Sequence, residues 1–552
     1  MRKSKMWRML TVAAVAASMT CGIIGVQSVS ADDKKTLKVA MECGYAPYNW
    51  TQPDDSNGAV QISGSSDYAY GYDVMMAKKI ADELGYDLEI VKLDWDSLVP
   101  AVQSGQVDCV IAGQSITKER QQMVDFTDPY YYASIITLVK NDGDYKDAAS
   151  VEDLKGATVT SQQNTIWYDS CLPQIPDADI LPAQESAPAM LVALESGKCD
   201  AVVTDMPTGK AACVAYPDFK LLDFSGTDGA FEVSDEDINI GISVQRGNDE
   251  LKDAINGVLK DMTEDDYNKM MDEAIAVQPL SESKRRSEML PESFGGRIIY
   301  LLQQYGPSFL KGAGVSMWLA LVGTLFGCII GFLVGIVQTI PVDKNDSTAK
   351  KVIIKVVKFI MACYVEFFRG TPMMAQAMFI YFGSAYLFNI NMSMWFAAIF
   401  IVSINTGAYM AETVRGGILS IDPGQTEGAK AIGMTHVQTM INVILPQALR
   451  NIMPQIGNNL IINIKDTCVL SIIGTVELFY TTKGVAGALY TYFESFTIAM
   501  VIYFIMTFTC SRILRVIEHK MDGPDNYDLA TADTLTHTSG MYSYKERKDS
   551  RE

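Results

Sequence analysis

Two long runs without a charged residue constrain the fold of this chain more than any other feature. They cover residues 312–342 and 370–411. A helix of about 20 apolar residues crosses the hydrocarbon core of a bilayer, so the second run is long enough for two spans joined by a turn near Asn389. Two more spans are expected at about 454–473 and 496–517. The sequence thus predicts an all-α membrane domain of five spans within residues 312–520.

Most of the negative charge lies before these runs. The chain has a formal net charge of −20, and residues 32–290 hold 47 acidic and 21 basic side chains. An acidic surface of this size repels nucleic acid, whose backbone is bound through basic side chains. Nucleic acid is therefore excluded as a partner of this block.

The first 31 residues have the pattern of an export signal. Basic residues at positions 2, 3, 5 and 8 precede an apolar stretch, and small residues follow at 29–31. We therefore expect residues 1–31 to be a signal peptide and residues 32–290 to lie outside the cell. Cys21 stands in a poor context for lipidation, and the sequence leaves open whether the signal is cleaved, retained or lipidated.

Cysteine and histidine usage excludes several kinds of site from the acidic block. All three histidines of the chain lie outside it, which excludes a Ser-His-Asp triad, a Cys-His pair and a histidine-ligated zinc site there. No CxxC pair is present, and an odd number of cysteines cannot all form disulfides within the block. No catalytic residue, metal or cofactor is predicted. The cysteines are Cys43, Cys109, Cys171, Cys199 and Cys213.

The acidic block alternates short apolar runs with segments of helical periodicity, such as TLKVAM, GYDVMMAKKIADELG and DLEIVKL. Strands that alternate with helices are typical of an α/β domain with largely parallel sheets. Two similar stretches, SGQVDCVIAG (104–113) and SGKCDAVVTD (196–205), each combine a helix end, a glycine cap and a buried strand. Their similarity predicts two lobes with one such unit in each.

The distribution of basic residues predicts how the spans are oriented. Lysines gather in the loop at 341–358, and Arg512 and Arg515 lie at the end of the last predicted span. Basic residues accumulate on the cytoplasmic side of a membrane, so this loop, the segment 412–453 and the C-terminus are expected inside the cell. Residues 291–311 are expected to form a linker or an interfacial helix, and residues 521–552 a disordered cytoplasmic tail.

The cytoplasmic segment 422–450 has the pattern of an amphipathic helix with a break. Asp422 is a suitable N-cap before a proline at the first helical position, and Gly433 allows a sharp bend. A stripe of apolar residues follows at helical spacing and is expected to end at Pro446. Such a helix either docks on a partner or lies on the inner membrane face, and the periodicity fits both. The stripe consists of Val437, Met440, Ile441 and Ile444.

The membrane half resembles the permeases of ABC importers for polar amino acids. The segments YVEFFRGTPMMAQ (364–376), AYMAETVRGGILSIDPGQTEGAKAIGM (408–434) and INIKDTCVLSIIGTVEL (462–478) carry this resemblance, which extends over about 300–520. It implies the ABC type I importer permease fold and identifies 422–450 as the EAA loop that couples to an ATPase. The sequence has no GxxxxGK[ST] motif for binding phosphate, so the ATPase is expected to be a separate chain. The coupling residues implied are Glu427, Ala429, Gly433 and Pro446.

The acidic block resembles the amino-acid solute-binding proteins that deliver to such permeases. GYAPYNW (44–50), GYDVMMAKKIADELG (71–85), WDSLVPAVQSGQVDCVIAGQSITKERQQMVDFTDPYYY (95–132) and AVVTDMP (201–207) carry the resemblance. It implies a two-lobed α/β fold of the type II periplasmic-binding-protein kind that closes on an L-amino acid. Lobe 1 is expected at 36–135 and 240–275, and lobe 2 at 141–237.

A zwitterionic amino acid needs a cation for its carboxylate and an anion for its ammonium group. Arg120 of lobe 1 is the expected carboxylate partner, because its planar fork can donate two parallel hydrogen bonds. Thr117 is a possible N-cap of the helix start that carries it. Asp205 of lobe 2 is the expected ammonium partner, although Asp-Met-Pro is also a good helix start. Without the resemblance, an arginine at the start of a helix is more often a surface residue. The resemblance adds Glu42, Tyr45, Trp95, Gly113, Ser115, Gln162 and Thr165 to the expected site.

Two departures from the family pattern bear on the substrate. Glu42 stands where an aspartate is common, and Asn164 stands before Thr165 where a glycine is usual. Two acidic groups, two aromatic rings and no second cation disfavour glutamate and aspartate. The expected substrate is glutamine, another neutral polar L-amino acid or a cationic one.

These expectations describe a fused subunit of a bacterial amino-acid importer. Two copies are expected to pair through the membrane domain and to bind two ATPase chains, and the chain itself is not expected to be an enzyme. A ligand-gated channel with the same binding domain would insert its pore between the lobes, and a sensor would need a cytoplasmic catalytic domain. An enzyme on this fold is disfavoured by the lack of histidine. These three are the alternatives.

Overall fold

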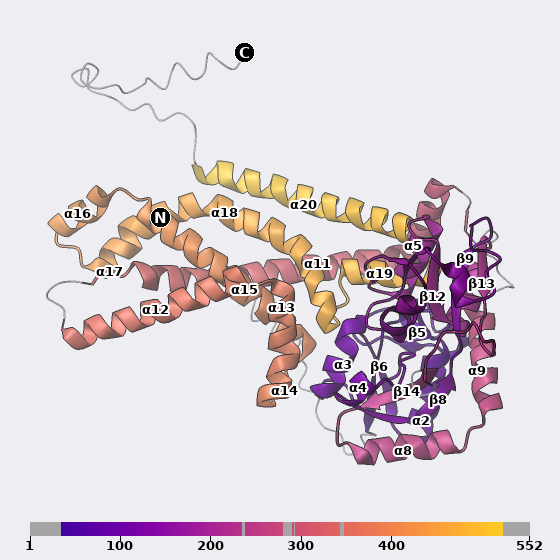
Figure 1. The fold of residues 1–552 in the computed structure, drawn as a ribbon. Helices are drawn as coiled ribbons and strands as arrows, with labels where there is room; N and C mark the ends of the chain where they lie inside the picture. Colours follow the sequence, from indigo (N-terminus) through magenta and orange to yellow (C-terminus); the bar gives the residue numbers. More distant parts are fainter. Residues whose placement is uncertain (1–34, 235–237, 280–289, 292, 343–346, 523–552) are drawn as a thin grey trace, which may run out of the picture.

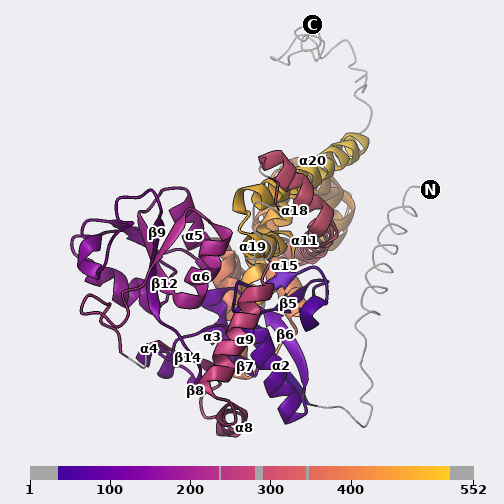
Figure 2. The same ribbon diagram turned by 90° about the vertical axis from the view of Figure 1, so that its right-hand side faces the viewer.

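The computed structural model describes residues 35–234, 238–279, 290, 291, 293–342 and 347–522. The predicted signal peptide and nearly all of the predicted tail lie outside these described residues. An α/β domain lies at one end of a group of long helices (Figure 1). Seen along those helices, the α/β domain divides into two lobes that lie side by side (Figure 2).

The first lobe is built on a sheet with the strand order β6-β1-β7-β14-β8. β1 pairs in parallel with β6 and β7, whereas β14 is antiparallel to β7 and β8. The strands are β1 (Thr36–Met41), β6 (Asp87–Lys92), β7 (Cys109–Val110), β8 (Asp125–Tyr132) and β14 (Asn239–Val244). The helices are α2 (Tyr72–Leu84), α3 (Trp95–Gln103), α4 (Lys118–Gln121), α8 (Asp249–Lys260) and α9 (Glu264–Val277). A small antiparallel sheet adds β2 (Gly44–Tyr45), β3 (Asn49–Gln52), β4 (Val60–Gln61) and β5 (Tyr68–Tyr70), with the short helix η1 (Ser56–Gly58).

The second lobe repeats this plan with the strand order β11-β10-β12-β9-β13. β10 is parallel to β11 and β12, and β9 is antiparallel to β12 and β13. The strands are β9 (Ile135–Lys140), β10 (Thr158–Thr160), β11 (Asp179–Ile180), β12 (Ala201–Asp205) and β13 (Phe219–Leu222). The helical segments are η2 (Val151–Leu154), η3 (Trp167–Cys171), η4 (Leu172–Gln174), α5 (Ala187–Glu195) and α6 (Met206–Ala215).

The chain passes between the lobes at the β8–β9 junction and returns to the first lobe with β14. The two glycine-capped stretches lie in different sheets, since β7 belongs to the first lobe and β12 to the second. Gly105 and Gly197 precede these strands with φ values of +69° and +70°, a left-handed conformation that favours glycine. The prediction of one such unit in each lobe is confirmed.

The membrane domain consists of long helices that run beside one another, with shorter helices at both ends (Figures 1 and 2). Helices α16 and α17 lie at the end opposite to the α/β domain (Figure 1). The long helices are α11 (Phe294–Thr339), α12 (Thr348–Gly370), α15 (Met394–Leu419), α18 (Leu445–Asp466) and α20 (Tyr492–Asp522). The shorter ones are α13 (Met373–Met378), η6 (Phe379–Gly383), α14 (Ser384–Phe388), α16 (Pro423–Ala431), α17 (His436–Thr439), η7 (Met440–Ile444), η8 (Thr467–Ile473) and α19 (Leu478–Leu489).

The predicted count of five spans is too high when helix length and apolar composition are the criteria. In the described part of the chain, α11, α15 and α20 are long and apolar enough to cross a membrane. A fourth span is reached only if His436–Ile473 and Leu478–Leu489, bent by 58°, count as one. The second predicted span falls on Met373–Phe388, which is shorter than the roughly 20 residues that a bilayer needs. A charge-free run does not show where its helices begin and end, here after Pro372 and at Asn389.

The predicted cytoplasmic loop at 341–358 is also corrected. Helix α12 begins at Thr348, with the Ser347 hydroxyl accepting a hydrogen bond from the Lys350 N–H. The lysines after this point lie on the first turns of a helix that packs against α15. Lysine is a good helix former, and its long aliphatic stem can lie along an apolar face while the ammonium group reaches water. A cluster of lysines between apolar runs therefore does not by itself indicate a loop.

The prediction of a broken helix at 422–450 is confirmed for the first part of the segment and wrong about where the helix ends. Asp422 caps α16 by accepting a hydrogen bond from Gly424 N–H, and Gly433 has a φ of +83°. Pro446, however, does not end the helix: helical conformation continues from α17 through η7 into α18. η7 is a turn of π-helix directly before Leu445, and such a turn changes the hydrogen-bond register where the proline lacks its N–H.

A stripe of glycines on α11 fixes its packing against α15. Gly323, Gly327, Gly331 and Gly335 are spaced by four residues and face α15 residues that are also spaced by four. A methyl group at Gly327 would lie 2.6 Å from Thr406 Cβ, and one at Gly335 would lie 2.8 Å from Val414 Cβ. Small residues at this spacing let two helix backbones approach closely within a membrane. This stripe of glycines was not predicted from the sequence.

Candidate functional site

Arg120 lies at the edge of the first lobe, where that lobe meets the second. Thr117 caps helix α4 by accepting a hydrogen bond from Arg120 N–H, as the sequence predicts. The guanidinium donates to the Ser115 carbonyl of its own lobe at 2.9 Å and to the Asn164 carbonyl of the second lobe at 2.6 Å. Its carbon Cζ lies 5.3 Å from the centre of the Trp95 ring, a favourable cation–π distance. Arg120 is only 9% exposed, and burial lowers its pKa to about 10, so it stays protonated at neutral pH.

A carboxylate of the first lobe binds the second lobe next to Arg120. Asp96 accepts hydrogen bonds from Gln163 Nε2 at 2.6 Å and from Asn164 Nδ2 at 2.7 Å. Asn164 has a φ of +55°, and asparagine is one of the few residues other than glycine that tolerate this conformation. The asparagine in place of the usual glycine therefore keeps the backbone turn and adds a side-chain contact between the lobes.

Asp205 lies at the end of β12 and is completely buried. It caps α6 by accepting a hydrogen bond from Thr208 N–H at 2.9 Å, and it also accepts one from the Tyr45 hydroxyl of the first lobe at 3.0 Å. The Tyr45 oxygen in turn accepts a hydrogen bond from the Thr208 hydroxyl. Burial raises the pKa of Asp205, and the hydrogen bonds from Thr208 and Tyr45 oppose that rise. The Asp205 carboxylate thus both caps a helix of its own lobe and contacts the opposite lobe.

Glu42 follows β1 in the first lobe. Burial raises the pKa of its carboxyl to about 8, and the ammonium group of Lys483 in the membrane domain opposes part of this rise. The negative charges of Asp94 and Asp96 raise the pKa further, while the side chain of Gln162 favours the ionised form. Glu42 is therefore largely protonated at neutral pH, and a cation placed beside it would favour its ionisation.

The remaining predicted residues surround these groups, but they do not all line one cavity. A cavity of about 710 Å³ is lined by Trp95, Arg120 and Thr165 among others, and not by Glu42, Tyr45, Gln162 or Asp205. The Thr165 hydroxyl donates to the Gln162 carbonyl at 2.6 Å. Ser115 offers its carbonyl to Arg120, and Gly113 has a φ of +62°.

A buried carboxylate that was not predicted from the sequence supports the Gly113 turn. Asp73, at the start of α2, accepts hydrogen bonds from Asn49 Nδ2 and from the Tyr130 hydroxyl, each at 2.7 Å. The Tyr130 oxygen accepts a hydrogen bond from Gly113 N–H at 3.1 Å. Burial raises the Asp73 pKa to about 6, against these hydrogen bonds. An Asp in a Gly-Tyr-Asp helix start gives no sign in the sequence of this role.

The predicted coupling residues lie at the far end of the membrane domain. Glu427 is exposed on α16, Ala429 is buried, Gly433 makes the bend before α17, and Pro446 is exposed in the first turn of α18. The apolar stripe is divided between two environments. Ile444 is buried and Met440 packs beside it, while Val437 and Ile441 are 63% and 58% exposed.

Both halves of the chain match known protein families. Residues 37–275 match the bacterial extracellular solute-binding proteins, family 3, and residues 349–523 match the inner membrane component of binding-protein-dependent transport systems. Among solved structures, an amino acid ABC transporter substrate-binding protein, AbpA of Streptococcus pneumoniae bound to L-arginine, is 28% identical. It covers 43% of this chain and 94% of its own, with a TM-score of 0.37.

Curated relatives match the membrane half. The putative glutamine transport system permease protein GlnP of Rickettsia conorii is 33% identical over 224 residues, which are 40% of this chain and 97% of that protein. The glutamine transport system permease protein GlnP of Escherichia coli K12 is 35% identical over 216 residues, 39% of this chain and 93% of that protein. The chain belongs to the inner membrane components of binding-protein-dependent transport systems, and it is an amino acid ABC transporter subunit in which a solute-binding domain and a permease domain are fused.

Proposed function

We propose that the fused domain captures glutamine, another neutral polar L-amino acid or a cationic one between Arg120 and Asp205. The observation that carries this proposal is that the buried side chains of Arg120 and Asp205 lack a partner of opposite charge. Among the described residues, neither Arg120 nor Asp205 has an oppositely charged side chain within 4 Å, although both are at least nine-tenths buried. A buried charge is costly unless it is paired. The carboxylate and the ammonium group of an amino acid would pair with both charges at once.

Because the two charges belong to different lobes, the ligand would favour the closed arrangement. Arg120 comes from the first lobe and Asp205 from the second. A ligand that contacts both lobes only when they meet shifts the population toward closure. Trp95 and Tyr45 would form walls about the side chain, and Gln162, Thr165, Gly113 and Ser115 would line the remainder.

We expect the full-length protein in lipid nanodiscs to bind glutamine or a cationic amino acid and not glutamate or aspartate. An additional ligand carboxylate would be placed near the negative charges of Asp94 and Asp96, which repel it. Titration calorimetry against the common L-amino acids measures this. Binding of none of them, or preferential binding of glutamate, would contradict the proposed substrate class.

The pH dependence of affinity separates the cationic from the neutral class. If a cationic side chain lies beside Glu42, the complex holds fewer protons than the free domain. Affinity for L-arginine then rises with pH below a pKa of about 8, by up to about tenfold per pH unit, and levels off above it. Affinity for L-glutamine should not rise over the same range. Titrations from pH 6 to pH 9 test this, and Glu42→Gln should abolish the rise. A rise that persists in Glu42→Gln would show that another group causes it.

For the membrane domain, we propose import driven by ATP hydrolysis on a separate ATPase chain. The exposed apolar side chains Ile432, Val437 and Ile441 beside Gly433 form a surface suited to docking, at the end remote from the binding domain (Figure 1). Two copies of this chain would pair through their membrane domains and bind two ATPase chains. In this arrangement the binding domain is outside a bacterial cell membrane, and the coupling helices and the C-terminus are inside.

A further inference from the structure

Helix α19 of the membrane domain lies against the binding domain where the two lobes meet. It contacts β2 and β3 of the first lobe. The approach is close, because a methyl group at Gly487 would lie 2.8 Å from the Gly44 carbonyl oxygen and one at Gly484 would lie 3.2 Å from Thr51 Oγ1. Directly after α19, the ring of its C-cap residue Tyr490 lies 5.5 Å from the Tyr216 ring of the second lobe, edge to face. One short helix therefore touches both lobes.

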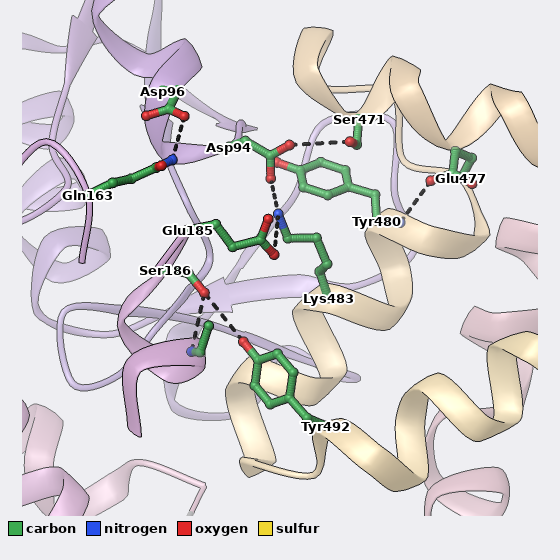
Figure 3. A network of polar contacts seen from close by, with 11 residues as sticks. Asp94, Asp96, Gln163, Glu185, Ser186, Ser471, Glu477, Tyr480, Lys483 and Tyr492 are labelled. Atoms are coloured by element: carbon green, nitrogen blue, oxygen red, sulfur yellow. Dashed lines mark hydrogen bonds and ion pairs between the residues drawn. The ribbon is translucent and has the colours of Figure 1, made fainter. Parts of the chain in front are cut away.

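Lys483 extends from the middle of α19 to a carboxylate of each lobe (Figure 3). Its ammonium group lies 2.8 Å from Asp94 Oδ1 of the first lobe and 3.7 Å from Glu185 Oε1 of the second. The Lys483 and Asp94 side chains are only 19% and 22% exposed, so water screens this pair less than a surface pair. Asp94 also accepts a hydrogen bond from the Ser471 hydroxyl at 3.2 Å.

The lobe-1 carboxylate belongs to the same short segment as the candidate ligand site. Asp94 is the residue at the N-cap position of α3, directly before Trp95 and two residues before Asp96, which binds the second lobe. On the other side, Glu185 precedes Ser186, which caps α5 and lies 3.4 Å from the Tyr492 hydroxyl of α20 (Figure 3). A movement that opens the lobes would separate these two segments from each other.

We propose that Lys483 makes docking of the binding domain on the membrane domain depend on lobe closure, by pairing with Asp94 and Glu185 at the same time. One ammonium group can reach both carboxylates only while the two lobes are together. Docking and closure then favour each other, because thermodynamic coupling between two events is reciprocal. This inference rests on the proposed function, since it takes the amino acid to be what closes the lobes.

Hydrogen–deuterium exchange of the full-length protein in nanodiscs tests the inference. Saturating L-glutamine or L-arginine, whichever the wild type binds, should slow backbone exchange in residues 478–489 by at least about fivefold, the lower end of typical coupling. This slowing of exchange by the ligand should be absent in Lys483→Met and in Glu185→Gln. It should be present in Lys483→Arg, which keeps the positive charge. Lys220→Met is the matched control, because Lys220 pairs with Asp147 on an exposed face of the second lobe, and it should behave like the wild type.

The Glu185→Gln variant separates a closure-dependent contact from a merely structural one. If Lys483 only holds the first lobe through Asp94, Glu185→Gln will leave the ligand effect on residues 478–489 intact, and the inference is overturned. Calorimetry on the same samples shows that each variant is folded and still binds the amino acid. If the wild type binds no amino acid, the proposed function fails and this inference fails with it. Normal binding with an unchanged ligand effect in Lys483→Met overturns the inference alone.

Discussion

Replacing Arg120 by alanine is expected to weaken amino-acid binding by at least about 30-fold, because loss of one partner of a desolvated charge pair costs roughly 2–5 kcal/mol. The guanidinium is buried and has no carboxylate within 4 Å among the described residues. Its hydrogen bonds within the protein go to the backbone carbonyls of Ser115 and Asn164. Without it, the ligand carboxylate would enter a low-dielectric site with no cation. Titration calorimetry of the full-length protein measures the loss.

Two further variants interpret this result. Arg120→Lys keeps the charge but loses the planar fork, so its affinity should lie between those of the wild type and the alanine variant. Arg246→Ala is the matched control, since Arg246 is exposed on the same lobe and donates to the Gln122 carbonyl. It should bind like the wild type. An affinity of Arg120→Ala within about threefold of the wild type would show that Arg120 does not bind the carboxylate, because even a surface pair is worth up to about 1 kcal/mol.

Those parts of the site that depend on local sequence could be predicted. Thr117 lies three residues before Arg120 and Asp205 three residues before Thr208, and both cap their helices as the spacing indicates. A cap is decided by residues within one helical turn. For the same reason, the glycine-capped strands of the two lobes could be recognised from stretches of ten residues.

The contacts between the lobes could not be predicted in the same way. Asp96 binds Gln163 and Asn164, which are 67 and 68 residues later in the chain, and Tyr45 binds Asp205, 160 residues later. Such pairs depend on how the two sheets are placed, and no spacing rule records this. The sequence shows that asparagine replaces the usual glycine at position 164. It does not show that this asparagine binds the Asp96 carboxylate, because Asp96 is distant in the chain.

The contacts between the domains are further still from any sequence pattern. Lys483 is 389 residues after Asp94, and a single lysine in an apolar segment gives no indication of its partner. In the membrane domain, the absence of charge located the apolar segments but not the boundaries of their helices. Pro372 and Asn389 shorten one predicted span, and the π-helical turn before Leu445 lets a helix continue where Pro446 was expected to end it.

Replacing Gly331 by leucine is expected to destabilise the membrane domain by about 3 kcal/mol or more, the upper end of what an overfilled core costs. A methyl group at Gly331 would collide with Met410 Cβ and would lie 2.9 Å from the Met410 carbonyl carbon and 3.0 Å from Ala411 N. Because backbone atoms are among these neighbours, a change of rotamer cannot relieve the collision, and α11 must separate from α15.

Gly314→Leu is the control that isolates this effect from the helix preference of the residue. Gly314 lies on the same helix, is exposed, and has no atom within 4 Å of an added methyl group. Leucine favours a helix over glycine by up to about 1 kcal/mol, so Gly314→Leu should match or exceed the wild type in its thermal midpoint. Gly331→Leu should have a lower midpoint or a lower yield of monodisperse protein in detergent. Both substitutions add the same side chain to the same helix and differ only in the atoms that this side chain contacts. Equal thermal midpoints for the two variants would therefore mean that the glycine stripe does not hold α11 against α15.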